Sequence, residues 1–202
     1  MAFTFFFRDM QTLESIRDHV IPAIKTRRYI NIWDAGCAMG PEPYSLAIVL
    51  RENMGKMIFR NVKIYATDID GSDLFGKIIK GGEYPGNQVQ RIPKNIFSKY
   101  FEPNGRRDHF IIADEIRKCV EFQKHDLLSL KPVRTNFVLI VCKNVLLHFK
   151  ETERINVFRM FHNALSENGF LAVEQTQKMP EKLKDWFEPV AANVQLFRKI
   201  LQ

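Results

Sequence analysis

The chain has little cysteine and no long apolar run. Its three cysteines, Cys37, Cys119 and Cys142, are odd in number and form no Cys-x-x-Cys pair. Neither a disulfide framework nor a zinc site is therefore expected, and a reducing compartment is indicated. Apolar stretches such as Phe137–Cys142 are far shorter than the ~20 residues of a membrane span. The Phe5–Phe7 segment lacks the basic flank of a secretion signal. The sequence predicts a soluble, cytoplasmic protein that does not insert into a membrane.

Acidic residues are the minority among the charged ones. The 202 residues include 30 Lys and Arg against 23 Asp and Glu, a net charge of +7. Such an excess favours an acidic partner without choosing among nucleic acid, membrane and protein. Because the basic residues are spread along the chain, a solvated basic face is the simpler interpretation. A hydrophobic content of 46% excludes a disordered chain.

Apolar periodicity predicts strands that alternate with helices. Helices are expected at 13–24, 42–53, 72–80 and 151–165, the last ended by Asn168-Gly169, and strands at 28–34, 62–67, 119–123, 137–142, 170–174 and 194–200. This alternation predicts an α/β fold with a doubly wound parallel sheet. Between the second and third strands the pattern is irregular, and residues 109–112 and 117–122 are interpreted as an antiparallel hairpin. Residues of about 84–120 are therefore expected to form a small antiparallel β subdomain inserted in one domain.

Polar residues follow several of the expected strands. Gly36 and Gly40 come after the first strand and Asp68 ends the second. Ligands of open α/β sheets bind at the carboxyl ends of strands, and an acid there can bind ribose hydroxyls. The Gly-x-x-x-Gly spacing suits a nucleoside with a short zwitterionic tail better than a pyrophosphate. The alternatives are a simple turn for the glycines and a helix cap for the acid, which Asp70 or Ser72 fits equally well.

The third and fourth strand ends extend this pattern. Asp126 can accept a hydrogen bond from an exocyclic adenine amine, and Leu127 beside it offers a backbone amide. Asn144-Val145 follows the apolar strand 137–142. A purely structural sheet does not require polar residues at four successive strand ends, so a nucleoside site is predicted there.

Five segments, in their order and spacing, resemble the chemotaxis receptor methyltransferases. They are 4–9 (Thr-Phe-Phe-Phe-Arg-Asp), 33–40 (Trp-Asp-Ala-Gly-Cys-Ala-Met-Gly), 42–45 (Glu-Pro-Tyr-Ser), 67–70 (Thr-Asp-Ile-Asp) and 142–145 (Cys-Lys-Asn-Val). The resemblance implies a Rossmann-like class I methyltransferase domain over residues 1–202. It also implies methyl transfer from S-adenosylmethionine, leaving S-adenosylhomocysteine, to glutamates in the cytoplasmic helical region of a methyl-accepting receptor. A monomer that does not act on nucleic acid is expected.

The resemblance also assigns site residues. Glu42 is expected to pair with the ammonium group of the cofactor, and Arg8 to offer its planar fork to a carboxylate of cofactor or substrate. Arg8 and His148 are the catalytic candidates; His148 stands where the family usually has a tyrosine, or is merely a partly exposed histidine at a helix start. The cofactor contacts implied are Thr4, Arg8, Gly36, Gly40, Glu42, Asp68, Asp126, Leu127, Asn144 and Val145.

The implied reaction needs no metal and no general base. A glutamate side chain in water has a pKa of about 4.3, so the nucleophile is already ionised at neutral pH. Alignment of the two reactants can then supply as much as roughly 7–11 kcal/mol of the barrier.

Departures from the family keep two alternatives open. The family arginine before Asn144 is Lys143, its His-Ser-Glu triplet is replaced from Gln175 onward, and the chain starts almost at the Thr-x-Phe-Phe-Arg motif, without most or all of the helical domain that precedes it in the family. One alternative is a catalytically degenerate module that binds the cofactor or its product. The other is a methyltransferase for another acceptor, such as nucleic acid.

Overall fold

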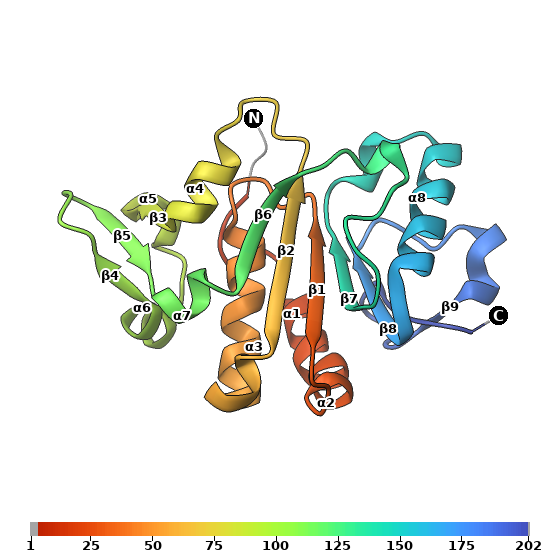
Figure 1. Cartoon of the computed structure of the whole chain (residues 1–202), viewed down its shortest axis with the longest axis horizontal. Coiled ribbons are helices and arrows are strands. Elements are labelled where there is room, and N and C mark those ends of the chain that lie inside the picture. Colours follow the sequence, from red (N-terminus) through yellow and green to blue (C-terminus); the bar gives the residue numbers. More distant parts are fainter. Residues whose placement is uncertain (1–3, 202) are drawn as a thin grey trace.

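The computed structural model describes residues 4–201, and a seven-stranded sheet forms its centre (Figure 1). The strand order is β6-β2-β1-β7-β8-β10-β9. The strands are β1 (Ile30–Ala35), β2 (Val62–Asp68), β6 (Val120–Lys124), β7 (Phe137–Cys142), β8 (Leu165–Val173), β9 (Phe187–Pro189) and β10 (Leu196–Lys199). The first five in the order pair in parallel, whereas β10 is antiparallel to both of its neighbours. The predicted α/β fold with a doubly wound, mostly parallel sheet is confirmed.

Helices connect the strands. Three short pieces, α1 (Met10–Ser15), a π-helical turn (Ile16–Val20) and α2 (Ile21–Ile24), follow one another without a break. The other helices are α3 (Pro41–Phe59), α4 (Phe75–Gly81), α5 (Gly86–Val89), α6 (Lys94–Tyr100), α7 (Asp114–Arg117) and α8 (Glu151–Ala164), with 3₁₀ turns at Leu127–Ser129, Leu146–His148 and Glu181–Trp186. Within residues 4–201, no helix has the length and apolar character needed to cross a bilayer.

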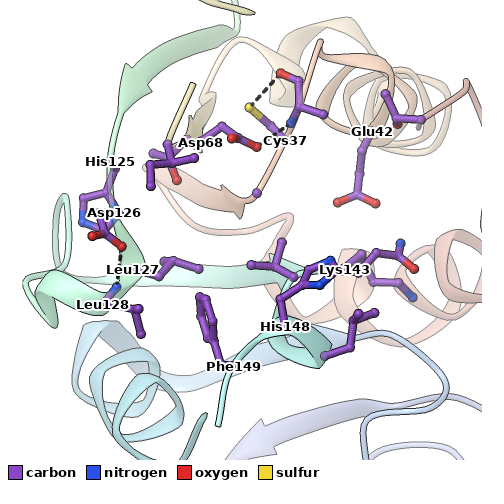
Figure 2. Close-up of a pocket in the computed structure, with 18 of the residues that line it drawn as sticks. Cys37, Glu42, Asp68, His125, Asp126, Leu127, Leu128, Lys143, His148 and Phe149 are labelled. Atoms are coloured by element: carbon purple, nitrogen blue, oxygen red, sulfur yellow. Dashed lines mark hydrogen bonds between the residues drawn. The ribbon is translucent and has the colours of Figure 1, made fainter. Parts of the chain in front are cut away.

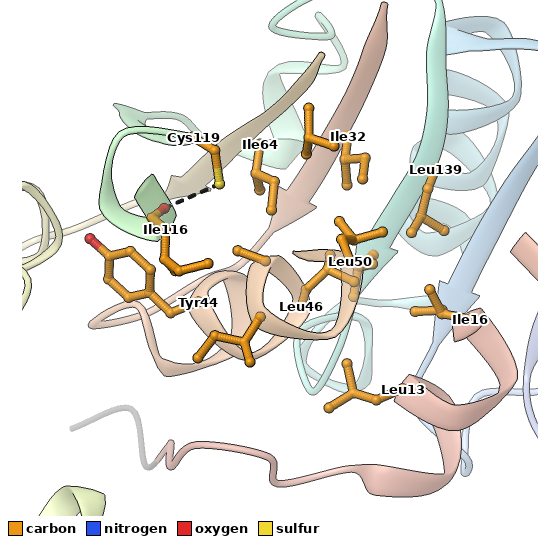
Figure 3. Close-up of a cluster of buried hydrophobic side chains, with 14 of the residues drawn as sticks. Leu13, Ile16, Ile32, Tyr44, Leu46, Leu50, Ile64, Ile116, Cys119 and Leu139 are labelled. Carbon is orange, nitrogen blue, oxygen red and sulfur yellow. Dashed lines mark hydrogen bonds between the residues drawn. The ribbon is translucent and has the colours of Figure 1, made fainter. Parts of the chain in front are cut away.

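Apolar side chains cover both faces of the sheet, as its doubly wound topology requires. Strand residues alternate between the faces, so Ile32 packs in one buried cluster and Trp33 in the other. Figure 3 shows the first cluster, in which side chains of α1 and α3 pack against Ile32, Ile64 and Leu139 of the strands. In the second cluster, α8 packs on the opposite face. Burial on both faces explains why β7 is apolar throughout.

A second, three-stranded antiparallel sheet lies beyond the β6 edge of the main sheet (Figure 1). Its order is β3 (Glu83–Pro85), β5 (His109–Ile112), β4 (Phe101–Pro103). The predicted hairpin of 109–112 with 117–122 is wrong, because β5 pairs with β3 and β4. Residues 120–124 instead form β6, parallel to β2. Each true partner of β5 has only three residues and ends in proline, which gives no strand signal in the sequence. The limits of an inserted subdomain, about 84–120, remain a prediction.

The end of α8 also differs from the expectation. The helix ends at Ala164, and Leu165 is already extended (φ −70°, ψ 141°). Asn168 and Gly169 lie inside β8, where the pairing with β7 shifts register. A side chain at Gly169 would stand 2.9 Å from the Ser166 carbonyl oxygen, so this glycine allows a close approach of backbones within the sheet instead of stopping the helix.

Candidate functional site

A pocket of about 630 Å³ opens at the carboxyl ends of the parallel strands (Figure 2). Ten of the eleven predicted site residues line it: Thr4, Arg8, Gly36, Glu42, Asp68, Asp126, Leu127, Asn144, Val145 and His148. They come from the segment before α1, from the first turn of α3 and from the chain at the ends of β1, β2, β6 and β7. Gly40 does not line the pocket, so its contact with a cofactor stays a prediction. The fold therefore gathers at one edge residues that are distant in the sequence.

The loop after β1 is attached to the end of β2. The backbone amides of Gly36 and Cys37 donate to the Thr67 carbonyl oxygen, at 2.7 and 3.0 Å. Gly36 has φ +104°, and a Cβ there would lie 2.1 Å from Cγ2 of Val145. Only glycine permits this combination of backbone angle and close approach. Gly40 has φ +100° and abuts Tyr84, so its structural role is to let the chain turn into α3.

Asp68 is held at the pocket wall by backbone groups. Its Oδ2 accepts a hydrogen bond from the Ala38 amide at 2.9 Å, and its Oδ1 accepts one from the Asp70 amide at 3.3 Å. Each carboxylate oxygen keeps capacity for a further bond. The capping role that the sequence left open belongs to Asp70, whose side chain accepts from the amides of Leu74 and Phe75 at the start of α4. Asp68 is thus available to a ligand.

The opposite end of the pocket combines an acid with apolar walls. The Asp126 side chain accepts a hydrogen bond from the Leu128 amide at 2.8 Å, which begins the 3₁₀ turn there. Leu127 is buried, and with Val145 and Phe149 it supplies apolar surface to the pocket. Figure 2 shows Leu127 and Phe149 facing the side from which Glu42 and Asp68 reach inward. A flat, apolar ring with a polar edge suits this end.

Glu42 lies in the first turn of α3 with its carboxyl group directed into the pocket (Figure 2). Burial raises the pKa of Glu42 to about 7, against the opposing effect of the Lys143 charge. Asp34, in β1 beneath it, is fully buried, and sequence reasoning missed it as a site residue. Burial, then the nearby carboxyl groups of Glu42 and Asp68, raise the pKa of Asp34 well above its usual range. The sequence signal that could have identified Asp34 is an acidic residue within a strand whose other residues are mostly apolar.

An ion pair between buried Lys143 and half-buried Asp9 lies on the other side of Glu42. Lys143, at the end of β7, has a 3% exposed side chain that bonds to the Asp9 carboxylate and donates to Thr12 Oγ1 at 2.9 Å. Burial is the largest single influence and raises the pKa of Asp9, but the hydrogen bond and charge of Lys143 together with the hydrogen bonds from Thr12 outweigh it, so the pKa of Asp9 is lowered. This network joins the segment before α1 to the sheet, so it positions Thr4 and Arg8 near the pocket.

The two catalytic candidates lie at the exposed mouth of the pocket. Arg8 Nη2 is 3.5 Å from Oδ1 of Asn144, as donor to acceptor. Asn144 has a left-handed backbone conformation (φ +60°), and its backbone amide donates to Oε2 of Glu174 at 3.2 Å. His148 ends the 3₁₀ turn after β7, and its amide donates to the Val145 carbonyl oxygen at 3.0 Å. The geometry brings both candidates to the same rim.

The comparisons with known proteins point to one family. The family model described as CheR methyltransferase, SAM binding domain, matches residues 2–196. Chemotaxis protein methyltransferases are similar to the chain: 32% identical over 86% of it in Borreliella burgdorferi, 31% over 86% in Listeria innocua and 31% over 88% in Pseudomonas aeruginosa. The chain spans 63%, 64% and 68% of the lengths of these relatives. A solved Synechocystis magnesium protoporphyrin IX methyltransferase aligns with a TM-score of 0.42 at 16% identity, over 83% of this chain and 56% of that one.

Proposed function

This chain belongs to the CheR methyltransferase family, whose cofactor is S-adenosylmethionine, and we propose that it methylates glutamate side chains of chemotaxis-type receptors. The substrate is the cytoplasmic helical region of a methyl-accepting receptor, and the protein acts in the cytoplasm as a monomer. The observation that carries the proposal is the pocket at the strand ends, where the acids expected to bind ribose, adenine and ammonium groups come together.

The residues at the pocket fit the parts of this cofactor. Asp68 can accept hydrogen bonds from both ribose hydroxyls. Each of its oxygens accepts one bond from a loop amide and keeps capacity for a second bond, on the side of the pocket that Asp68 lines. Asp126 and the amide of Leu127 suit the polar edge of adenine, and the apolar wall suits its ring. Glu42 suits the ammonium group through a charge-assisted bond. Gly36 supports this fit, because a side chain there would collide with Val145, which lines the same pocket.

The mouth of the pocket suits a helical protein substrate. Large apolar side chains stand exposed at its edge: Ile69 at 63%, Leu147 at 50% and Leu128 at 42%. Exposed apolar groups that cluster beside a pocket are typical of an interaction surface. Arg8 stands at the same mouth, where its guanidinium group can hold an acceptor carboxylate in a planar fork.

The chain promotes the transfer mainly by alignment. Bound S-adenosylmethionine supplies an electrophilic methyl group. Glu42 and Asp68 hold the ammonium group and the ribose of the cofactor, while Arg8 orients the attacking carboxylate and His148 can donate a hydrogen bond at the rim. Neutralisation of opposite charges favours the transfer where water is excluded. An already ionised carboxylate needs no proton acceptor.

Transfer of a labelled methyl group from S-adenosylmethionine to a receptor cytoplasmic fragment tests the proposal. We expect incorporation that is released as methanol by mild base, since a glutamyl ester is base-labile. A receptor fragment with glutamines in place of the candidate glutamates is the control and stays unlabelled. Base-stable label, or no label with an active cofactor-binding protein, would contradict the proposal.

A cofactor-binding module without turnover is the second candidate. The observation in its favour is His148, exposed where the family has a tyrosine. Calorimetric binding of S-adenosylhomocysteine without any methyl ester formation would favour this candidate. A methyltransferase for nucleic acid, suggested by the charge of +7, would instead label nucleic acid with a strong dependence on salt.

A further inference from the structure

The least explained group near the pocket is the carboxyl of Asp34. Its exposed fraction is 0%, and within residues 4–201 no N–H or O–H group donates a hydrogen bond to either of its oxygens. A buried carboxyl that accepts no hydrogen bond is costly, and an ionised one far more so. Asp34 lies near the carboxyl end of β1, next to the glycine loop, so such a group is a candidate for a functional role.

The pleat of β1 directs Asp34 toward α3. Side chains two residues apart share a face of a strand, and Ile32 packs in the cluster that includes α3 (Figure 3). Asp34 therefore faces the first turn of α3, where Glu42 lies. Glu42 is close enough to interact with Asp34 both through charge and as a hydrogen-bond partner.

We propose that Asp34 is a positioning residue that stays protonated at neutral pH and donates its proton in a hydrogen bond to the Glu42 carboxylate. This bond holds Glu42 in the orientation that receives the ammonium group of the cofactor. Asp34 does not itself line the pocket, so it acts through Glu42. The inference rests on cofactor binding by the family site and is independent of the acceptor that is methylated.

The surrounding charges determine the sign of the effect. The groups that bear on the pair from the neighbouring elements are Arg8, Asp9, Cys37, Asp68, Cys142 and Lys143. Asp68 disfavours a charge on Asp34, while Lys143 and Arg8 favour the charge on Glu42. The proton therefore remains on Asp34 and leaves Glu42 first, as the two acids share one low-dielectric site.

Cofactor affinity then depends on pH through Glu42. Burial raises the pKa of Glu42 to about 7 in the empty pocket, and an ammonium partner lowers it in the complex. Binding below that pH releases a proton, so affinity falls as the solution becomes more acidic. For one group with a pKa of about 7, the Kd rises about fivefold from pH 7 to pH 6.

Calorimetric titration of S-adenosylhomocysteine from pH 5.5 to 7.5, in buffers of different ionisation enthalpy, tests the proposal with two variants. Asp34→Asn keeps a neutral donor, and we expect its Kd and pH profile to stay within about twofold of the unmodified protein. Asp34→Leu has no donor, so the Glu42 pKa rises and the pH-dependent region moves upward. We expect its Kd at pH 7 to increase about tenfold, with more protons released.

Three results would overturn the proposal. In the first, Asp34→Asn binds more tightly and its profile moves to lower pH, which is the behaviour expected if Asp34 were ionised. In the second, a folded Asp34→Leu keeps the original profile, so that Asp34 is only structural. In the third, carboxyl ¹³C resonances of the ligand-free protein show Asp34 ionised at pH 7; this readout needs no ligand. Asp73→Asn, which removes an exposed acid after the same strand that carries Asp68, is the matched control and leaves the profile unchanged.

Discussion

Asp68 holds its own loop in place before any ligand arrives. Its bond to the Ala38 amide joins the end of β2 to the glycine loop, and the same carboxylate faces the pocket. Glu42, by contrast, gains its orientation from buried neighbours on two sides, Asp34 and Lys143. At this scale the site is a set of acids held by neighbouring groups, of which Ala38 and Lys143 line the pocket while Asp34 does not.

Asp68→Ala removes the acceptor for the ribose hydroxyls and frees the Ala38 amide. We expect the binding free energy of S-adenosylhomocysteine to weaken by about 1–3 kcal/mol, measured by calorimetry. Asp73→Asn is the control, because Asp73 pairs with Lys124 at the surface. Unchanged affinity in Asp68→Ala would remove Asp68 from the site.

His148→Phe keeps an aromatic ring at the rim and removes its hydrogen-bonding nitrogens. We expect the Kd of the cofactor to stay the same and kcat on a receptor fragment to fall about tenfold or more, as for loss of one positioned donor. His148→Tyr, which restores a donor, should recover part of the rate. A fully active His148→Phe would show that His148 has no catalytic role.

The glycine loop between β1 and α3 is the element that determines the shape of the pocket. Gly36→Ala forces a positive φ on alanine and drives a methyl group to 2.1 Å from Val145. The matched control is Gly55→Ala in α3, which has φ +75° and no atom within 4 Å of the added Cβ.

Urea unfolding and cofactor titration of these two variants measure how much the close approach of Gly36 to the Val145 side chain contributes to stability and to cofactor binding. Both alanines lose about 1–3 kcal/mol because each residue keeps a backbone conformation with positive φ that only glycine adopts easily. We expect Gly36→Ala to lose more stability than Gly55→Ala and also to weaken cofactor binding, because it displaces Val145. Equal losses of stability in the two variants, with cofactor binding unchanged, would mean that the loop can accommodate a methyl group at Gly36.

Six of the seven strands of the main sheet could be predicted from the sequence, whereas β9 in that sheet and β3 and β4 in the small one could not. β7 is a continuous apolar run between polar residues, a signal carried entirely by local sequence. β3 and β4 have three residues each and become strands only because β5 pairs with both. The strand 120–124 was assigned partly to a hairpin because its true partner, β2, is more than fifty residues away.

The same distinction applies to the site. Asp68 and Asp126 follow strands, so strand topology alone brought them together. Asp34 does not line the pocket and acts on the site only through Glu42, and the pairing of Lys143 with Asp9 joins two segments that are distant in the sequence. Such contacts depend on how a helix packs on the sheet, which no spacing in the sequence encodes.

The whole described chain consists of one sheet with a buried cluster on each face and a small sheet beyond its edge. Side chains of the small sheet, such as Tyr84 and Phe101, belong to the same cluster as β1 and α3. Shared core residues favour a single cooperative unfolding transition.

Saturation with product tests this cooperativity. S-adenosylhomocysteine at 100 times its Kd should raise the free energy of unfolding by about 2.7 kcal/mol, because it binds only the folded chain. Circular dichroism and tryptophan fluorescence should report one coincident transition that moves as a unit. A second unfolding transition whose midpoint does not change with the ligand would mean that the inserted sheet unfolds independently.

A crystal structure of the protein with S-adenosylhomocysteine tests the central claim most directly. We expect the adenosine in the pocket above the glycine loop, with the ribose hydroxyls on Asp68, the adenine edge at Asp126 and Leu127, and the amino group on Glu42. A ligand bound elsewhere, or one that leaves Asp68 and Glu42 without contact, would contradict the account.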